Sequence, residues 1–299
     1  MVATLFTLTT LALVQQTDTQ VAVRPGMRLD LSNFAGAIAV KAWAENAVRV
    51  RAEYSSEGYV ELTLEPSALL VKASSRGGPP PSVDYRINAP AWMALDLSGV
   101  NTDITIDGAQ APVTAETVNG EVKCRGGAGN ISLRSVQGAV GLADAKGHVE
   151  VSTVNDDVTL SGVSGDVTAQ TVSGDLELRA IDSPNVDVST VSGSVTYEGT
   201  IQDGGHYRFA THNGDVTLGV PDKANATVSV ATFNGDFDSS FPISLTGTTK
   251  HRFTFTIGSG TARIELETFN GDIKLRRATE LRGEHDHEHH EHHEHEEDH

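Results

Sequence analysis

A nine-residue repeat runs through the middle of the chain and limits the fold more than any other feature. Stepping by nine from Gly120 reaches positions 102 to 174, and five of the other eight marker positions are also glycine. The residues two and four places after every marker are apolar, as Val122 and Cys124 are, whereas the residue between them, such as Lys123, is mostly polar. This alternation is typical of strands with one buried face. Short strands repeated at constant length bury that face by stacking on one another.

Two kinds of corner alternate along the repeat. Markers 120, 138, 156 and 174 have Thr or Ser three places before them, whereas the markers between them have Gly or Asp at that place. One turn of the chain therefore takes eighteen residues and has two faces. The residue two places before each marker, such as Val118, is apolar or small, so we assign that column to the interior as well. The marker glycines indicate corners that need a positive φ. The sequence predicts an all-β, two-sided β-solenoid with coils of about 18 residues.

The Thr corner returns after the regular region, with larger spacings. Markers Gly193, Gly214, Gly235 and Gly271 follow at intervals of 19, 21, 21 and 36 residues. We interpret the interval of 36 as two coils and residues 182–185 as an insertion on a corner. Two phenylalanines lie two places before their markers, which assigns them to the core and not to a sugar-binding platform. They are Phe233 and Phe269.

The repeat divides the chain into four segments. Residues 1–19 begin with an apolar stretch of the length of a secretory signal peptide, and the alternative interpretation is a first β-strand. Residues 20–98 are expected to form the N-terminal strands and a cap, because an open stack exposes strand edges. Residues 99–277 hold the solenoid repeats. Residues 278–299 form an acidic, histidine-rich tail that is predicted to be disordered.

The corner motifs are similar to those of a known family. The units at 171–176 (Thr-Val-Ser-Gly-Asp-Leu) and 268–273 (Thr-Phe-Asn-Gly-Asp-Ile), with the opening segment 29–40, resemble the bacterial family of exported proteins labelled "putative adhesin", a domain of unknown function. The resemblance covers about residues 20–277. It implies a β-solenoid of the cell envelope, provides no catalytic residues and does not include the tail.

Charge and cysteine content exclude several functions. The net charge is −18, of which eight acids lie at 284–299, so the rest of the chain carries −10. Such a chain, with no basic stripe, repels phosphate backbones, and we predict no nucleic-acid binding. The single cysteine, Cys124, lies in an apolar column and is expected to be a small buried residue and not a reactive thiol.

The repeat contains no assembled catalytic motif. Polysaccharide enzymes need paired carboxylates in a cleft, whereas most acids here directly follow the markers, which is a turn position. Calcium binding, as in β-rolls, and polysaccharide hydrolysis remain the less favoured alternatives. His148, His206, His212 and His251 occur singly and are expected to be structural. The acids concerned are Asp103, Glu121, Asp157, Asp166, Asp175, Asp215, Asp236 and Asp272.

The tail contains the strongest candidate metal ligands in the sequence. Eight imidazoles are interleaved with carboxylates there, and neutral imidazole binds Zn²⁺, Ni²⁺ and Cu²⁺. No cofactor is required by any other part of the sequence. The alternative is that the tail is only a solubilising acidic segment. The predicted ligands are His285, His287, His289, His290, His292, His293, His295 and His299.

Together, the repeat and its resemblance favour a non-catalytic scaffold or adhesin-like interaction module of the cell envelope. Its partner would be an envelope protein or a glycan. The alternative is a periplasmic metal-binding or metal-buffering protein that acts through the tail. We expect an exported protein, periplasmic or at the cell surface, that is not an integral membrane protein once the signal is removed.

Overall fold

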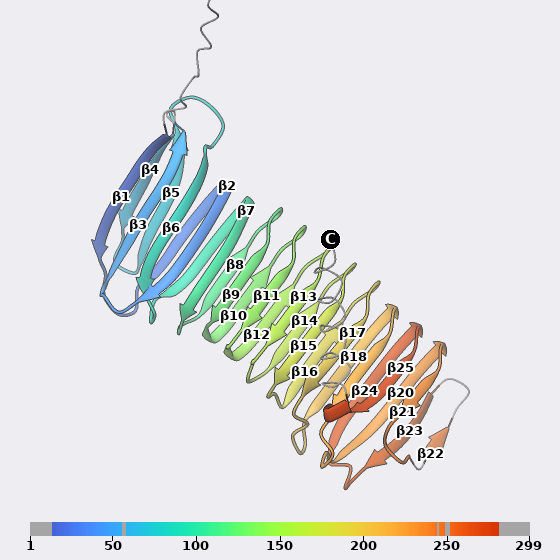
Figure 1. Cartoon of the computed structure of the whole chain (residues 1–299). Coiled ribbons are helices and arrows are strands. Elements are labelled where there is room, and N and C mark those ends of the chain that lie inside the picture. The colour runs from blue at the N-terminus through green and yellow to red at the C-terminus, as the bar shows by residue number, and fades with distance from the viewer. Residues whose placement is uncertain (1–13, 56–57, 244, 249–251, 281–299) are drawn as a thin grey trace, which may run out of the picture.

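The chain forms a rod of stacked β-coils with a cap of longer strands at its N-terminal end (Figure 1). The computed structural model describes residues 14–55, 58–243, 245–248 and 252–280. Strands are by far the most common element of this part, with turns and bends between them, and the helix at 278–280 is a single turn. The predicted all-β, two-sided solenoid is confirmed.

Each coil contributes one strand to each of two faces, which we call face A and face B. Neighbouring strands pair in parallel, and their inward residues recur every eighteen positions in the regular region, as Val149 and Val167 do on face A. Strands β2 (Arg28–Trp43) and β7 (Ala94–Ala109) pass round a corner and belong to both faces. After β7, face A consists of β8 (Val113–Glu116), β10 (Ala128–Arg134), β12 (Lys146–Ser152), β14 (Val167–Gln170), β16 (Asn185–Ser189), β18 (His206–Asn213), β24 (Ala262–Asn270) and β20 (Ala226–Asn234). Face B consists of β9 (Val122–Gly126), β11 (Val140–Ala143), β13 (Val158–Ser161), β15 (Leu176–Ile181), β17 (Val195–Gly199), β19 (Val216–Val220), β25 (Ile273–Arg277) and β21 (Phe237–Ser239).

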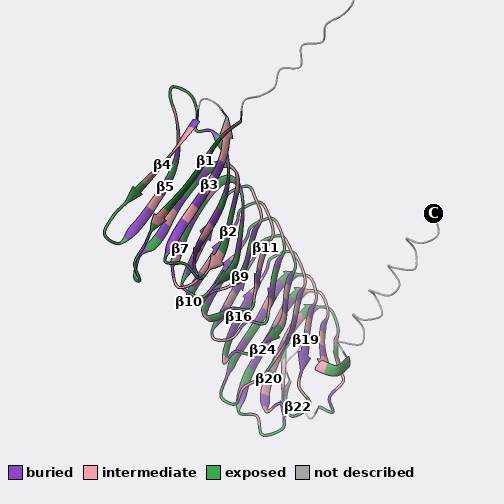
Figure 2. Cartoon of the chain, turned by 60° about the vertical axis from the view of Figure 1, so that its left-hand side comes forward, coloured by how far each residue is buried: buried purple, intermediate pink, exposed green. Residues whose placement is uncertain are grey.

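The core lies between the two faces and runs the length of the rod. Buried and more exposed residues alternate along the strands (Figure 2). Val158 and Leu160 are fully buried, whereas Thr159 between them is exposed. The predicted inward columns two and four places after the markers are therefore confirmed. Since each coil alone has an apolar face and no partner for it, burial of these columns against neighbouring coils is the main stabilising contribution.

The N-terminal cap covers the first coil from outside. Strand β2 lies between β7 on one side and β5 (Ala68–Ser75) and β6 (Ser82–Pro90) on the other. Beyond them, β3 (Ala47–Ser55), β1 (Val14–Ala22) and β4 (Gly58–Leu64) pair antiparallel. The structure thus places residues 14–19 in a strand, while residues 1–13 lie outside the described part, so the signal peptide stays a prediction.

The C-terminal coils do not follow the order of the sequence. Strand β24 pairs with β18 on one side and with β20 on the other, so the coil formed last is inserted before the coil that precedes it in the chain (Figure 1). Residues between these coils form the antiparallel strands β22 (Leu245–Thr248) and β23 (Arg252–Ile257); β23 pairs with β20, and β22 pairs with β23. The interpretation of the 36-residue interval as two coils is therefore wrong. A coil edge offers the same parallel pairing to any later coil, so sequence spacing cannot determine the order.

The Thr corner turns its hydroxyl inward. Thr171 donates through Oγ1 to the carbonyl oxygen of Asp156 in the preceding coil (3.0 Å). Because Thr171 faces the interior, the next residue faces out, and Val172 is 45% exposed. The assignment of this column to the core is therefore wrong at the Thr corner, although it holds at the other corner, where Val163 is 1% exposed. The same bond is made by Thr117, Ser135, Thr153, Thr190, Thr211, Thr268 and Thr232.

The marker glycines at the Thr corner are required chiefly by the closeness of neighbouring coils. At Gly138, φ is 141° and an added Cβ would lie 2.1 Å from the carbonyl oxygen of Gly120. At Gly174, φ is outside the left-handed region, so the positive-φ explanation is wrong there. A Cβ at Gly174 would nevertheless lie 2.0 Å from the carbonyl oxygen of Asp156. Both positions need glycine because the backbone of the preceding coil occupies the space of a side chain.

Candidate interaction surfaces

A continuous line of exposed apolar side chains follows the Thr corner along the rod, and we call it the corner ridge. Each of its Val and Phe side chains is between 37% and 52% exposed. Large exposed apolar surfaces on soluble proteins mark interaction sites. In order along the rod the ridge consists of Phe34, Val100, Val118, Val136, Val154, Val172, Val191, His212, Phe269 and Phe233.

The rings at the C-terminal end of the ridge stack on one another. The Phe233 and Phe269 ring centroids are 5.0 Å apart with planes 3° apart, and His212 stacks on Phe269 at 4.9 Å and 12°. The two phenylalanines predicted to be core residues are therefore exposed, because they occupy the outward place after the inward threonine. Each shared ring face is covered by its neighbour, so the stack presents mainly ring edges to solvent.

The acids that follow the Thr-corner markers hold the backbone of the next coil. Asp157 accepts a hydrogen bond through Oδ1 from the N–H of Asp175 (2.7 Å), and Asp215 accepts one from the N–H of Asp272 (2.9 Å). This is the turn role predicted for them. Within residues 14–280, as far as they are described, His, Cys, Asp and Glu side chains form no group of three or more that could hold a metal ion.

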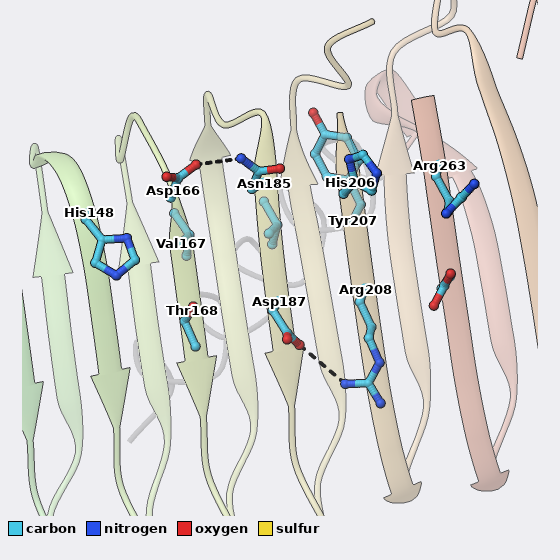
Figure 3. A pocket seen from close by; sticks show the side chains of 12 residues that line it. His148, Asp166, Val167, Thr168, Asn185, Asp187, His206, Tyr207, Arg208 and Arg263 are labelled. Atoms are coloured by element: carbon cyan, nitrogen blue, oxygen red, sulfur yellow. Dashed lines mark hydrogen bonds and ion pairs between the residues drawn. The ribbon is translucent and has the colours of Figure 1, made fainter. Parts of the chain in front are cut away.

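A polar groove of about 440 Å³ crosses five neighbouring strands of face A (Figure 3). Strands β12, β16, β18 and β24, and the residue directly before β14, each place one polar side chain at equivalent positions along it. Asn185 donates to Asp166 in this row (2.8 Å). The side chains of three of the five residues make no hydrogen bond or ion pair within the described part of the chain. The row consists of His148, Asp166, Asn185, His206 and Arg263.

A second row lies two residues further along the same strands. Arg208 contacts Asp187 through Nη1 at 3.4 Å, and it contacts Glu267 at 3.6 Å. Thr168 and Glu265 also line the groove, whereas Glu267 lies beside it. The buried residues Val167, Val186 and Tyr207 form the rest of the lining. Cations and carboxylates alternate here, so the groove has many donors and acceptors without a strong net charge. A ligand of matching chemistry is polar, extended and largely uncharged.

Sequence reasoning placed none of these groove residues in a site. His148 and His206 were expected to be isolated, yet the coil register brings both to one row (Figure 3). Each directly follows a glycine of the second corner, Gly147 or Gly205, and this shared phase was the available signal. The insertion at 182–185 and the longer coil after it hid the phase, because they break the interval of eighteen.

The other predicted functional residues separate into buried and undescribed ones. Cys124 is 4% exposed, and burial raises the pKa of its thiol to about 12. It is therefore the small buried residue that its column predicted. The tail histidines, His285 to His299, and His251 lie outside the described residues.

Comparison with known families identifies the solenoid. The family model described as Toastrack DUF4097 matches residues 91–276, which is more than half of the chain. The chain belongs to the Toastrack family. This confirms the resemblance inferred from the corner motifs, although the match begins only just before β7. The Toastrack region thus contains the groove and all of the corner ridge except Phe34, and the strands of the cap precede it.

The solved structures that match this Toastrack chain share little sequence with it. One is named "putative adhesin", from Parabacteroides distasonis ATCC 8503, with a TM-score of 0.37, 9% identity, and coverage of 87% of this chain and 97% of that chain. A second, from the same organism, is named "Putative lipid binding protein", with a TM-score of 0.36, 9% identity and the same coverages. A third, named "putative cell adhesion protein", comes from Clostridium sporogenes ATCC 15579, with a TM-score of 0.28, 10% identity, and coverage of 88% and 100%.

No curated protein sequence matches the chain. In the described part of the Toastrack protein, no helix has the length and apolar character needed to cross a membrane.

Proposed function

We propose that this Toastrack protein is a non-catalytic, adhesin-like interaction module of the cell envelope, exported to the periplasm or the cell surface, that binds a neutral oligosaccharide along the polar groove. The observation that supports this most is the row of five polar side chains at equivalent positions of five adjacent coils. Three of them, His148, His206 and Arg263, have no protein partner for their side chains in the described structure. They are available to a ligand.

The spacing of the row matches a chain of sugars. Adjacent strands lie about 4.8 Å apart, which is comparable to the length of one pyranose unit. An oligosaccharide that runs along the rod, across the strands, would therefore meet one polar side chain per unit. Hydroxyl groups both donate and accept hydrogen bonds, so they match a surface where Arg263 can donate. Asp166 and Asp187 can accept there too, through lone pairs beyond the bond that each accepts from Asn185 or Arg208.

A binding role accounts for the groove carboxylates better than a catalytic role does. Asp166 accepts a hydrogen bond from Asn185, and Asp187 contacts Arg208, so both carboxylates already hold neighbouring side chains. Glycoside hydrolysis instead needs two carboxyl groups directed at one bond, one of them as an acid. We therefore propose binding without hydrolysis, and the experiment below also detects cleavage of the sugar.

Calorimetry with neutral tetrasaccharides (cello-, malto-, chito- and mannotetraose) tests the proposal. We expect one of them to bind the full chain, and Asp187→Ala/Arg208→Ala to weaken that binding at least about tenfold. The matched control is Glu177→Ala/Arg179→Ala, which removes an ion pair from face B and should leave affinity unchanged. Failure of all four sugars to bind, equal weakening by the control, or release of shorter sugars would contradict the proposal.

We propose metal buffering through residues 278–299 as a second function, because eight histidines occur there within fifteen residues. A chain that ends at Arg282 should keep its circular dichroism and melting temperature, since the inward columns end at Leu275. It should lose most Zn²⁺ binding at pH 7.5, and binding by the full chain should fade below the imidazole pKa of about 6.5. Equal Zn²⁺ binding by both chains would place the site elsewhere.

The signal peptide at 1–19 can be tested separately by N-terminal sequencing of the exported protein. A mature N-terminus at residue 20 would remove six of the nine residues of β1.

A further inference from the structure

The corner ridge has no function in the groove-binding proposal, and its length and composition indicate a partner of the same shape. We propose that two copies of the protein associate side by side through their corner ridges, with the two rods parallel and in register. Three features support this association: the extent of the exposed apolar surface, the absence of charge along it, and the acidic column beside it. The association does not depend on the oligosaccharide proposal.

The ridge is large enough for a stable contact. Ten side chains, nine of them Val or Phe between 37% and 52% exposed, present on the order of 600 Å² of apolar surface. Standard protein interfaces bury about 800 Å² per partner. The Asn, Gln and Ser residues that directly follow the ridge residues in the sequence, which we call the polar row, bring the surface close to that value. The row is itself ordered, since Asn119 donates to Asn101 (2.7 Å) and Asn270 donates to Asn213 (2.8 Å).

The ridge is also the one long strip on the Thr corner that lacks charged side chains. In each of the ten coils, three consecutive residues contain no Asp, Glu, Lys or Arg. They are the inward residue of the Thr corner, the ridge residue and the residue that follows it. The chain as a whole carries −18, so two copies repel one another over most surfaces. Self-association at this strip avoids burying an unpaired charge. The polar row begins beside Ala35 and consists of Asn101, Asn119, Gln137, Asn155, Ser173, Ser192, Asn213, Asn270 and Asn234.

The acidic column beside the ridge selects the parallel arrangement. On the face B side, the residue after the marker is Asp or Glu in seven of the ten coils, whereas on the face A side the residue four places before the marker is uncharged in seven. In an antiparallel pair, the two-fold axis is perpendicular to the long axes of the rods, and the acidic columns of the two copies would face each other. With the axis along the rods, each acidic column faces the mostly uncharged flank of its partner, which avoids like-charge repulsion. Every ridge residue then meets its own counterpart.

Sedimentation equilibrium of the full chain at micromolar concentrations tests the association. We expect a dimer, and we expect Val136→Glu/Val172→Glu to raise its dissociation constant on the order of a hundredfold. Both valines are on the surface, at 37% and 45% exposure, so the fold should persist. The control, Thr105→Glu/Thr159→Glu, adds the same charge to exposed positions of face B and should leave the dimer intact. A monomeric wild-type chain, or equal weakening by the control, would overturn the proposal.

Cross-linking of single-cysteine variants tests the orientation. The native Cys124 is buried and does not compete for a thiol reagent in the folded chain. In the parallel dimer, Val118→Cys and Val191→Cys should each cross-link to an identical copy through a short bismaleimide, and a mixture of the two should form no mixed product. In the antiparallel dimer, Val118 would face His212, and neither variant would cross-link to itself. A dimer without self-cross-linking would therefore refute the parallel assignment while leaving oligosaccharide binding unaffected.

Discussion

Three glycines separate two reasons for which a position excludes a side chain. Gly138 and Gly174 lie at the Thr corner, and Gly77 lies in the exposed loop between β5 and β6. Gly77 has a φ of 152° and open space where a Cβ would be. Gly174 has a φ outside the left-handed region, but its Cβ would lie 2.0 Å from a carbonyl oxygen of the neighbouring coil. Gly138 combines a φ of 141° with a contact of 2.1 Å. Alanine at each position therefore tests backbone strain alone, close approach alone, and both together.

The expected losses of stability follow from backbone strain at Gly77 and from hydrogen bonds at the Thr corner. Gly77→Ala should cost about 1 kcal/mol, because its exposed loop can relax part of the ordinary strain of about 1–3 kcal/mol. At Gly174 the coils must separate by about 1.5 Å before Cβ reaches an ordinary contact distance. That movement weakens the bonds made there by the Thr171 hydroxyl and by the N–H groups of Ser173 and Asp175. Because each of these three hydrogen bonds contributes about 0.5–1.5 kcal/mol, Gly174→Ala should cost about 2–4 kcal/mol of stability. Gly138→Ala should cost more than either.

Urea unfolding followed by far-ultraviolet circular dichroism measures these differences. Repeat proteins do not always unfold in one step, so the three variants are compared with the wild type by the same probe and by both midpoint and slope. The expected order of destabilisation is Gly77→Ala, then Gly174→Ala, then Gly138→Ala. Equal losses for Gly77→Ala and Gly174→Ala, or a loss below about 1 kcal/mol at Gly174, would refute close approach as the reason for glycine at this corner.

Three further predictions concern the core and the Thr corner. Val158→Asp should unfold the rod, because it buries an unpaired carboxylate, whereas Thr159→Asp at the adjacent exposed position should change stability by no more than about 0.5 kcal/mol in the same urea assay. Thr171→Val removes the hydroxyl bond to the preceding coil and leaves a carbonyl without that donor, so it should cost about 1–2 kcal/mol, while Thr171→Ser should restore most of the loss. Burial raises the pKa of Cys124 to about 12, so the folded chain should resist iodoacetamide at pH 8 and become modified only in denaturant. Mass spectrometry detects the modification, and rapid modification of the folded chain would contradict the burial of Cys124.

Much of the candidate groove could not be located from the sequence. Its residues belong to five different coils, and the interval between them changes from eighteen residues to nineteen, to twenty-one and then to fifty-seven. Arg263 joins His206 only because the last coil inserts beside β18. Asp187 and Arg208 were visible as outward positions, but nothing in their spacing indicated that they contact each other.

The sequence by itself determined the solenoid, its eighteen-residue coil and its inward columns. Period-2 alternation and a constant interval permit few other ways to bury Val158, Leu160 and their equivalents. Only the tertiary structure decided the order of the terminal coils, because every coil edge offers equivalent parallel pairing to any other coil. It also decided that Val172 faces solvent. Two neighbouring residues of a corner cannot both face inward, and Thr171 takes the inward place because its hydroxyl reaches a carbonyl oxygen that is found only in the preceding coil.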